Sequence, residues 1–281
     1  MTHFLSPPIL REMRKITLSS QGLGDAWLLY QGDTLPAIVR KKGFQAHRVS
    51  IEDLYNLGYD YKNIEIIPGK AHFPLLHFFR HQPDYDYYCI IEYDVRFTGS
   101  WQQLFRDINS VEADFLTSHI LHYPYDPNWP HWDLSHPHKN IPAKERIRGY
   151  NPIFRVSNRA LAQVDKAHKD NWRGHNEVLL TTLLDHNGLE ILDFNQIEKS
   201  NNSSRELYIP TRRNSKGTTV PGTIRYRPVH NRSPYLPDKL YHPVKPMESQ
   251  PWTWSLSRLA HHIKIWLEYL RLAIYAKVGS E

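Results

Sequence analysis

The sequence predicts an α/β fold in which a mostly parallel sheet is flanked by helices and followed by a C-terminal helix. Strand-like apolar runs alternate with helix-like segments over the first third of the chain, and this alternation implies parallel strands joined by helices. The clearest run, over 87–94, is rich in β-branched and aromatic residues, which is typical of a strand buried on both faces. A length of 281 residues with 40% hydrophobic content fits one globular domain with a sizeable core.

The individual elements follow from apolar periodicity and from turn residues. We expect strands over 25–30, 44–49, 87–94, 113–118, 151–156 and 191–194, and helices over 34–42, 51–57, 70–81, 101–109, 158–168, 176–187 and 252–278. Residues 123–142 hold five prolines, three histidines and two tryptophans, which predicts a long irregular loop of the kind that often serves function. The expected organisation is a loose lead-in over 1–25, an α/β domain over 26–246 and an amphipathic helix within 247–281.

The composition points to a reducing compartment. The first 14 residues hold no continuous apolar run, which argues against a signal peptide, and no stretch reaches the roughly 18 to 20 apolar residues needed to cross a bilayer. The single cysteine, Cys89, excludes an intramolecular disulfide framework, and its apolar surroundings predict a buried strand residue. We therefore expect a cytoplasmic protein.

The net charge of +6 is concentrated late in the chain. Residues 201–245 hold nine Lys or Arg and only two acidic residues. Such a segment can hold a diphosphate, nucleic acid or anionic lipid, or it can be a solvated loop. No recognisable nucleic-acid module surrounds it, which argues against a nucleic-acid partner.

Two carboxylates follow the strand predicted over 87–94. Glu92 and Asp94 are two residues apart, so in an extended chain both point to the same side, beyond the end of the strand where α/β proteins bind ligands. Mg²⁺ and Mn²⁺ prefer such oxygen ligands, together with substrate phosphates. The alternative is that either carboxylate caps the strand or pairs with Arg96.

The segment Glu92-Tyr93-Asp94 resembles the D-x-D motif of glycosyltransferases with the GT-A fold, and residues 84–101 resemble a set of GT-A-like bacterial and eukaryotic proteins of unknown function. The resemblance implies a GT-A-like, Rossmann-related sheet and a bound Mn²⁺ or Mg²⁺. It makes Asp94 the metal ligand and places Glu92 near the donor ribose or beside the metal. The chain departs from the motif in having Glu where the first Asp is usual.

A second part of the resemblance is the segment over 172–177, which is similar to the position where GT-A enzymes carry an acid at a helix start. This implies that Glu177 is the general base that accepts the proton of the acceptor hydroxyl in an inverting reaction. The helix N-terminus would support its charge, but a carboxylate is also simply favourable in a first helical turn. Retaining GT-A enzymes place acids in similar regions, so retention stays an alternative.

A third part lies late in the chain, where GT-A enzymes often return a histidine to the metal. This implies that His242 completes the metal site and that Lys245 contacts a phosphate oxygen. Arg225 and Arg227 alternate along a short strand-like segment and suit a diphosphate, although exposed edge-strand arginines are the alternative. Asp33 follows the first strand, where the donor base or ribose is often held.

The aromatic residues of the long loop favour a site for the acceptor sugar. We expect Trp129 and Trp132 to stack on sugar rings, and Trp172 and His175 to complete a pocket beside Glu177; loop packing is the alternative. A zinc site is conceivable among the loop histidines, but their spacing fits no structural zinc pattern and no cysteine helps. These histidines are His122, His131, His136 and His138.

The C-terminal helix expected over 252–278 combines an apolar stripe with basic positions. This composition suits a helix lying on an anionic membrane surface, and equally one that packs on the sheet or on a second subunit. The protein is therefore expected in the cytoplasm, with a peripheral position on the inner face of the membrane as the second expectation.

Taken with the resemblance, the sequence predicts a metal-dependent, inverting glycosyltransferase of cell-surface polysaccharide or glycolipid synthesis. Its donor would be a nucleoside-diphosphate sugar, with a UDP-sugar favoured, and its acceptor a hydroxyl of a saccharide or a lipid-linked glycan. One alternative is a nucleotidyltransferase-type enzyme, although residues 21–25 are a poor match to a phosphate loop and precede the first strand. The other is a non-catalytic glycan- or lipid-binding protein of the same fold.

Overall fold

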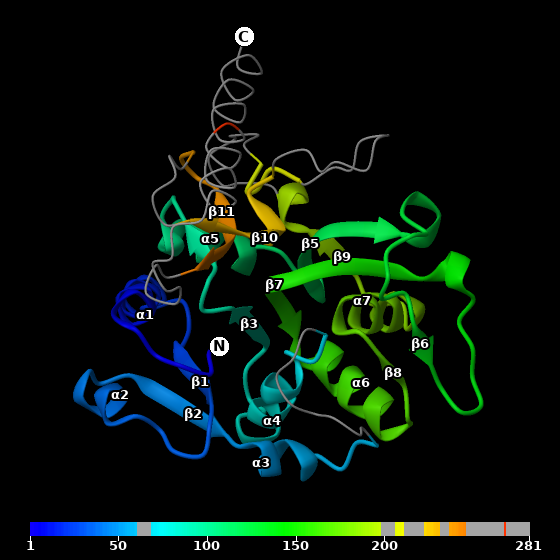
Figure 1. Cartoon of the computed structure of the whole chain (residues 1–281), viewed down its shortest axis with the longest axis horizontal. Helices are drawn as coiled ribbons and strands as arrows, with labels where there is room; N and C mark the ends of the chain where they lie inside the picture. Colours follow the sequence, from blue (N-terminus) through cyan, green and yellow to red (C-terminus); the bar gives the residue numbers. More distant parts are fainter. Residues whose placement is uncertain (61–68, 198–205, 211–221, 231–235, 246–266, 268–281) are drawn as a thin grey trace, which may run out of the picture. The chain divides into compact units, whose positions relative to one another are not determined.

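The computed structural model describes residues 1–60, 69–197, 206–210, 222–230, 236–245 and 267 (Figure 1). The chain divides into two compact units. Unit 1 comprises Met1–Tyr93 and Phe105–Ile197, and unit 2 comprises Asp94–Leu104 and Glu198–Glu281. The described part is mixed α/β, with small and only partly parallel sheets. The expected α/β class is confirmed at this level.

The N-terminal residues are built into unit 1. Helix α1 spans Pro7–Ser19, beginning with two prolines whose fixed φ suits a first helical turn, and it buries Ile9 and Met13. The Met1 amino group donates to the carbonyl oxygen of Ile91 at 2.7 Å. The prediction of a loose lead-in over 1–25 is therefore wrong for these residues.

The next elements match the sequence prediction closely. Strand β1 (Trp27–Gln31) pairs in parallel with β2 (Gln45–Val49), and α2 (Ala37–Lys41) connects them. Helix α3 (Ile51–Tyr55) begins with a capping box formed by Ser50 and Asp53. Helix α4 (Phe73–His81) packs against both β1 and β2.

The main sheet of unit 1 differs from the expected one. Its strand order is β3-β7-β5-β9, formed by Tyr87–Ile91, Ile147–Ser157, Phe115–His122 and Ile191–Asp193. The long strand β7 lies between β3 and β5 and is antiparallel to both, whereas β9 is parallel to β5 (Figure 1). The expectation of a mostly parallel sheet is thus wrong at β3. The strand is also not buried on both faces, because it lies at the end of the described strand order and its burial alternates, with Tyr88 and Ile90 buried and Cys89 exposed. An apolar run fixes neither the direction of a strand nor its position in the sheet.

Two helices cover the centre of this sheet. Helix α6 (Asn158–Lys169) starts with Ser157 as its N-cap, and both α6 and α7 (Asn176–His186) pack against β7. Gly188, at a φ of +72°, allows the turn that follows α7. The core beneath includes Phe115, Phe154 and Leu180, all fully buried.

The segment predicted as a long loop is largely irregular. It contains the 3₁₀ turn η1 (Tyr123–Tyr125) and the two-residue strand β6 (Leu134–Ser135), which pairs with β8 (Arg173–Gly174); a second 3₁₀ turn, η2 (Ala143–Glu145), follows it. The last described turn of unit 1 is η3 (Phe194–Gln196). Helix α5 spans Trp101–Asn109, as predicted.

Unit 2 holds a three-stranded sheet of order β10-β11-β4. Strand β11 (Leu240–Lys245) is antiparallel to β4 (Arg96–Phe97) and parallel to β10 (Ile224–His230). The helix predicted over 252–278 lies outside the described residues, apart from residue 267. Among the described residues, no helix has the length and apolar character needed to cross a bilayer.

Candidate functional site

Unit 2 brings together the two predicted metal ligands. Asp94 and His242 are 148 residues apart in the sequence, yet His242 Nε2 lies 3.5 Å from Asp94 Oδ1. The pairing of β11 with β4 causes this approach. The backbone hydrogen bonds between the two segments extend past β4 to Asp94, whose carbonyl oxygen accepts from the Val244 N–H at 2.7 Å. Both side chains are at most 10% exposed. A carboxylate oxygen and an imidazole nitrogen in this arrangement form a donor set that suits Mn²⁺.

Unit 1 carries the predicted base, Glu177, in the first turn of α7. Glu177 is 7% exposed, and its Oε2 accepts no hydrogen bond among the described residues. Burial raises the pKa of Glu177 to about 8; the positive charge of Arg148 opposes this rise and the carboxylate of Glu92 adds to it. A buried carboxyl group with a pKa close to neutrality is a candidate for proton transfer.

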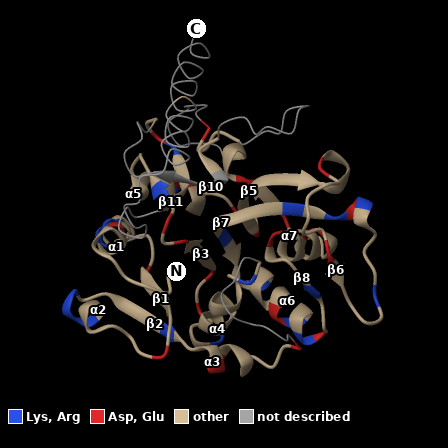
Figure 2. Ribbon diagram, in the orientation of Figure 1, with Lys and Arg blue, Asp and Glu red and all other residues tan. Residues whose placement is uncertain are grey.

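Arg148, which was not predicted as a site residue, is a positively charged side chain that acts on Glu177. It lies on β7, where basic positions are blue in Figure 2, and donates to Asp126 Oδ2 at 2.9 Å. Its guanidinium lies 5.1 Å from the centre of the Trp129 ring. No signal in the sequence pointed to it, because Arg148 lies before the strand expected over 151–156, whereas β7 begins at Ile147.

His175 caps the N-terminus of α7. Its Nδ1 accepts from the Glu177 N–H at 3.4 Å and lies 3.9 Å from Glu177 Oε2. The ring is stacked on His131 with 4.6 Å between the centroids, and it lies over Gly69, where an added Cβ would collide with it. Burial, with a smaller contribution from His131, lowers the pKa of His175 to about 4, so the ring is neutral near pH 7.

The three tryptophans expected to bind the acceptor are buried. Trp129 and Trp132 are 8% and 6% exposed and form a cluster with Val178, and Trp172 is 8% exposed in the main core. Because their rings pack against protein, the structure favours the loop-packing alternative over stacking on a sugar. The loop histidines do not gather around a metal position in the described structure: His131 stacks on His175, and His136 packs on Trp172.

The other residues predicted to bind the sugar donor are described in part. Asp33 is exposed in the turn after β1, and Glu92 follows β3, where its N–H donates to the Pro152 carbonyl at 2.9 Å. Arg225 and Arg227 lie on β10 and Lys245 ends β11, as suits the short strand expected there. The side chains of these three basic residues lie outside the described part of the chain.

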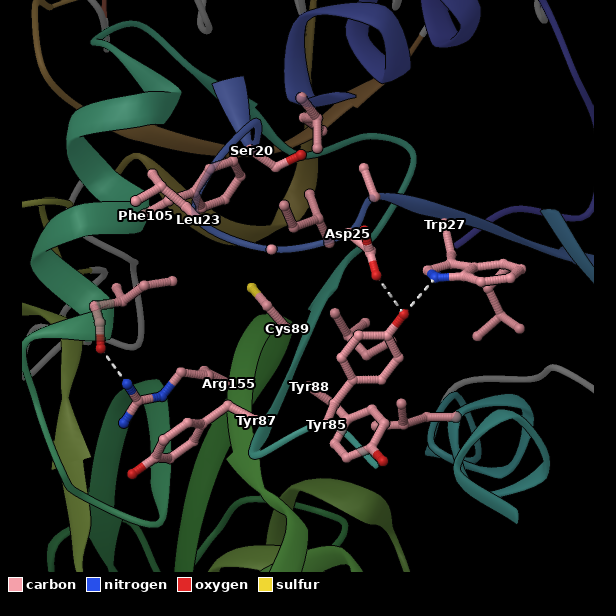
Figure 3. A pocket seen from close by; sticks show the side chains of 18 of the residues that line it. Ser20, Leu23, Asp25, Trp27, Tyr85, Tyr87, Tyr88, Cys89, Phe105 and Arg155 are labelled. Carbon is pink, nitrogen blue, oxygen red and sulfur yellow. Dashed lines mark hydrogen bonds between the residues drawn. The ribbon is translucent and has the colours of Figure 1, made fainter. Parts of the chain in front are cut away.

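A cavity of about 330 Å³ lies elsewhere in unit 1, between α1, β1, β3 and α5 (Figure 3). Aromatic residues, including Trp27 and Tyr85, line it, and neither Glu92 nor Glu177 does. Cys89, expected to be buried, instead exposes its side chain to this cavity. Protein atoms nonetheless line the cavity around the thiol, and burial raises the pKa of Cys89 to about 12.

Residues 46–112 match the model of a family described as "Protein of unknown function (DUF3405)". The matched segment contains Glu92 and Asp94 and ends before Glu177 and His242. Among curated proteins, none matches the chain significantly.

Proposed function

We propose that the protein is a metal-dependent glycosyltransferase that moves a sugar from a nucleoside diphosphate to a hydroxyl of a glycan or lipid-linked acceptor. The observation that carries the proposal is the approach of His242 to Asp94 in unit 2. Asp94 is predicted as a ligand from the carboxylate spacing and the resemblance, and His242 from the resemblance, and the 3.5 Å between their ligand atoms is compatible with a shared ion. A GT-A-like arrangement is part of this proposal.

The proposal gives each group one task. Asp94 and His242 would hold Mn²⁺ or Mg²⁺, which when bound neutralises charge on the leaving diphosphate. The acceptor oxygen attacks the anomeric carbon, the bond from that carbon to the diphosphate oxygen breaks, and Glu177 takes the proton of the hydroxyl. The joint action of these groups on one donor and acceptor is taken from the resemblance.

Glu177 supports the assignment of a base through its burial. A buried carboxyl lowers the stability of the fold when it ionises. Its raised pKa also gives Glu177 the proton affinity that a base needs to accept a proton from a hydroxyl. The positive charge of Arg148 stabilises the ionised form of Glu177, to which the carboxyl must return by releasing its proton to solvent after each transfer. Inversion, a UDP-sugar donor and a cytoplasmic or membrane-peripheral location remain parts of the proposal that follow from the sequence.

The test is isothermal titration of the purified full chain with UDP and with GDP, each with and without Mn²⁺. It is repeated on Asp94→Asn and His242→Gln, with Glu206→Gln as a matched control, because Glu206 is an exposed carboxylate of the same unit. We expect nucleotide binding that needs Mn²⁺, weakened more than about tenfold by either ligand substitution and unchanged in the control. If neither nucleotide binds at millimolar Mn²⁺, the transferase proposal fails and the non-catalytic binding protein becomes the better account.

A further inference from the structure

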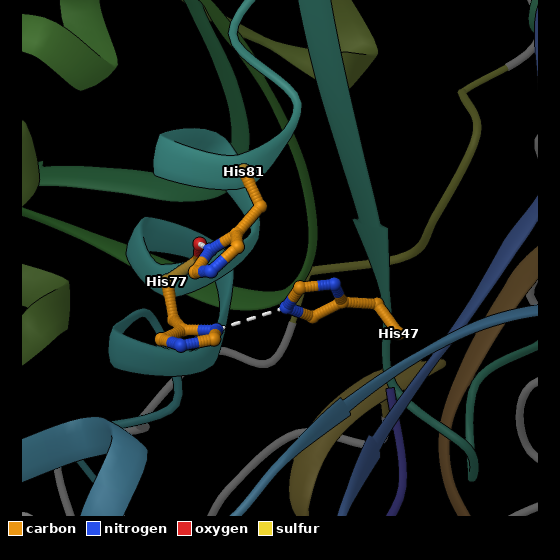
Figure 4. A group of neighbouring side chains, drawn as sticks. All are labelled: His47, His77 and His81. Atoms are coloured by element: carbon orange, nitrogen blue, oxygen red, sulfur yellow. Dashed lines mark hydrogen bonds between the residues drawn. The ribbon is translucent and has the colours of Figure 1, made fainter.

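Three histidines of unit 1 face one another in a cluster that the proposed function does not use. His47 comes from β2, and His77 and His81 lie one turn apart on the same side of α4 (Figure 4). Each ring offers a nitrogen, and these three atoms all lie within 4.8 Å of one another. His47 and His77 are partly buried, whereas His81 is exposed.

The hydrogen bonds of the cluster orient the rings. His81 Nδ1 lies 2.8 Å from the carbonyl oxygen of His77, so it carries a proton and leaves the lone pair on Nε2. His47 Nε2 and His77 Nδ1 are 2.9 Å apart, so one donates and the other accepts. Metal-binding histidines are commonly held in this way, with one ring nitrogen bonded to a carbonyl and the other free for an ion.

The surroundings keep the partly buried rings uncharged. Burial, followed by the neighbouring His77 and His81, lowers the pKa of His47 to about 4. Burial and His81 also lower the pKa of His77. Arg48 acts in the same direction and Asp53 opposes it. His47 and His77 are therefore held in the neutral form that binds metals.

We propose that His47, His77 and His81 form a second metal site, which takes a divalent transition-metal ion and has zinc as its expected occupant. Three imidazoles with no carboxylate or thiolate in the group suit Zn²⁺, Cu²⁺ or Ni²⁺, whereas Mg²⁺ and Ca²⁺ prefer oxygen ligands. Its chemistry therefore differs from that of the Asp94–His242 pair. With three protein ligands, the fourth tetrahedral position is left for water.

To hold such an ion, the His47 and His77 nitrogens need only a small adjustment, and the His81 nitrogen, which lies within 4.8 Å of both, has to reach the same spacing. Zn–N bonds of 2.0–2.1 Å in a tetrahedron place two nitrogens about 3.3 Å apart, so the 2.9 Å contact between His47 and His77 would open by about 0.4 Å. When the ion binds, the ring that donates this hydrogen bond moves its proton to its other ring nitrogen, so that both facing nitrogens present a lone pair. Because the ion would join β2 to α4, binding is expected to stabilise the folded chain.

The alternative is that the three rings are a packed, hydrogen-bonded group that binds no ion. Ring contacts alone account for the 4.3 Å between the centroids of His77 and His81. The chain has 17 histidines, so weak binding of zinc at scattered positions is also expected. An experiment therefore has to locate the ion as well as detect it.

The test uses the full chain after treatment with EDTA. Zn²⁺ binding is measured by equilibrium dialysis with elemental analysis, Co²⁺ serves as a spectroscopic probe, and thermal unfolding is followed with and without Zn²⁺. The variants are His47→Gln and His81→Gln, and the matched control is His186→Gln, an exposed histidine of α7. His81 is exposed, so its substitution is not expected to disturb folding.

We expect one tightly bound Zn²⁺ per chain, a visible tetrahedral Co²⁺ spectrum, and a rise of several degrees in the unfolding temperature with Zn²⁺. Both cluster variants should weaken this binding more than tenfold and lose the temperature rise, while His186→Gln keeps both. Equal zinc affinity in the wild type and both cluster variants would overturn the proposal, as would the absence of binding. Mn²⁺-dependent UDP binding is measured in the same variants; its retention shows that the two proposals stand or fall separately.

Discussion

The substitution Glu177→Gln tests whether this carboxyl is held protonated by its surroundings. Near pH 6 the folded protein keeps a proton on Glu177, whose pKa is about 8, whereas the unfolded chain, with an ordinary value of 4.5, has lost it. Unfolding therefore releases a proton, and the free energy of unfolding falls as the pH rises from 4.5 to about 8, then levels off. Glutamine has the same size and cannot ionise, so the variant lacks this dependence.

The magnitude follows from the two units between pH 6 and the folded pKa of about 8. At 1.36 kcal/mol per unit, the wild type should lose about 3 kcal/mol more than Glu177→Gln between pH 6 and pH 9. The assay is urea unfolding of both proteins at the two pH values, with Glu145→Gln as a control that removes an exposed carboxylate of the same unit. Parallel pH profiles for the wild type and Glu177→Gln would refute the reasoning, because they would show that Glu177 ionises normally.

Other predictions concern groups outside the candidate sites. Arg155 is 1% exposed and donates to three backbone carbonyls, so Arg155→Leu should lower the unfolding free energy by about 3 kcal/mol or more in urea titrations; a change under 1 kcal/mol would contradict this. Burial alone would raise the pKa of Asp165, but hydrogen bonds from Lys169, Tyr59 and Arg80 outweigh it and lower the pKa. Asp165→Asn should therefore cost about 1–3 kcal/mol at pH 7, and the difference from wild type should shrink as the pH falls below 3.8. The thiol of Cys89 should react slowly with a disulfide reagent at pH 7.5 and rapidly once urea unfolds the chain; equal rates would show an ordinary thiol pKa.

The sequence predicted most local elements because their signals are local. Helix α7 was expected over 176–187 and is found at Asn176–His186, since its apolar residues and Gly188 lie within one short window. Helix α1 lies in the segment predicted as a loose lead-in, although its first residues, Pro7 and Pro8, are of the type that favours a first helical turn. The direction of β3 could not be predicted, because its partner β7 begins more than 50 residues later and strand hydrophobicity carries no direction.

In the candidate sites, too, local features could be predicted from the sequence and long-range contacts could not. Asp94 and His242 were predicted as ligands from motifs, but only the pairing of β11 with β4 shows that they meet. The burial of Glu177 could not be predicted, since a carboxylate in a first helical turn is usually exposed. His47 and the two histidines of α4 were missed because a pair at helical spacing becomes a cluster only when a strand brings a third.

The cost of burying Glu177 is itself an argument for function. A raised pKa means that the fold loses stability whenever this side chain ionises, and a glutamine or leucine in α7 would avoid that loss. Such local conflicts between a residue and its surroundings are expected where activity requires them. Arg148 shows that the region is not simply apolar, because it places a positive charge where the ionised form of Glu177 can use it. Glu177→Gln should therefore separate the two demands, removing the pH-dependent loss of stability and the proposed sugar transfer together while leaving Mn²⁺-dependent nucleotide binding intact.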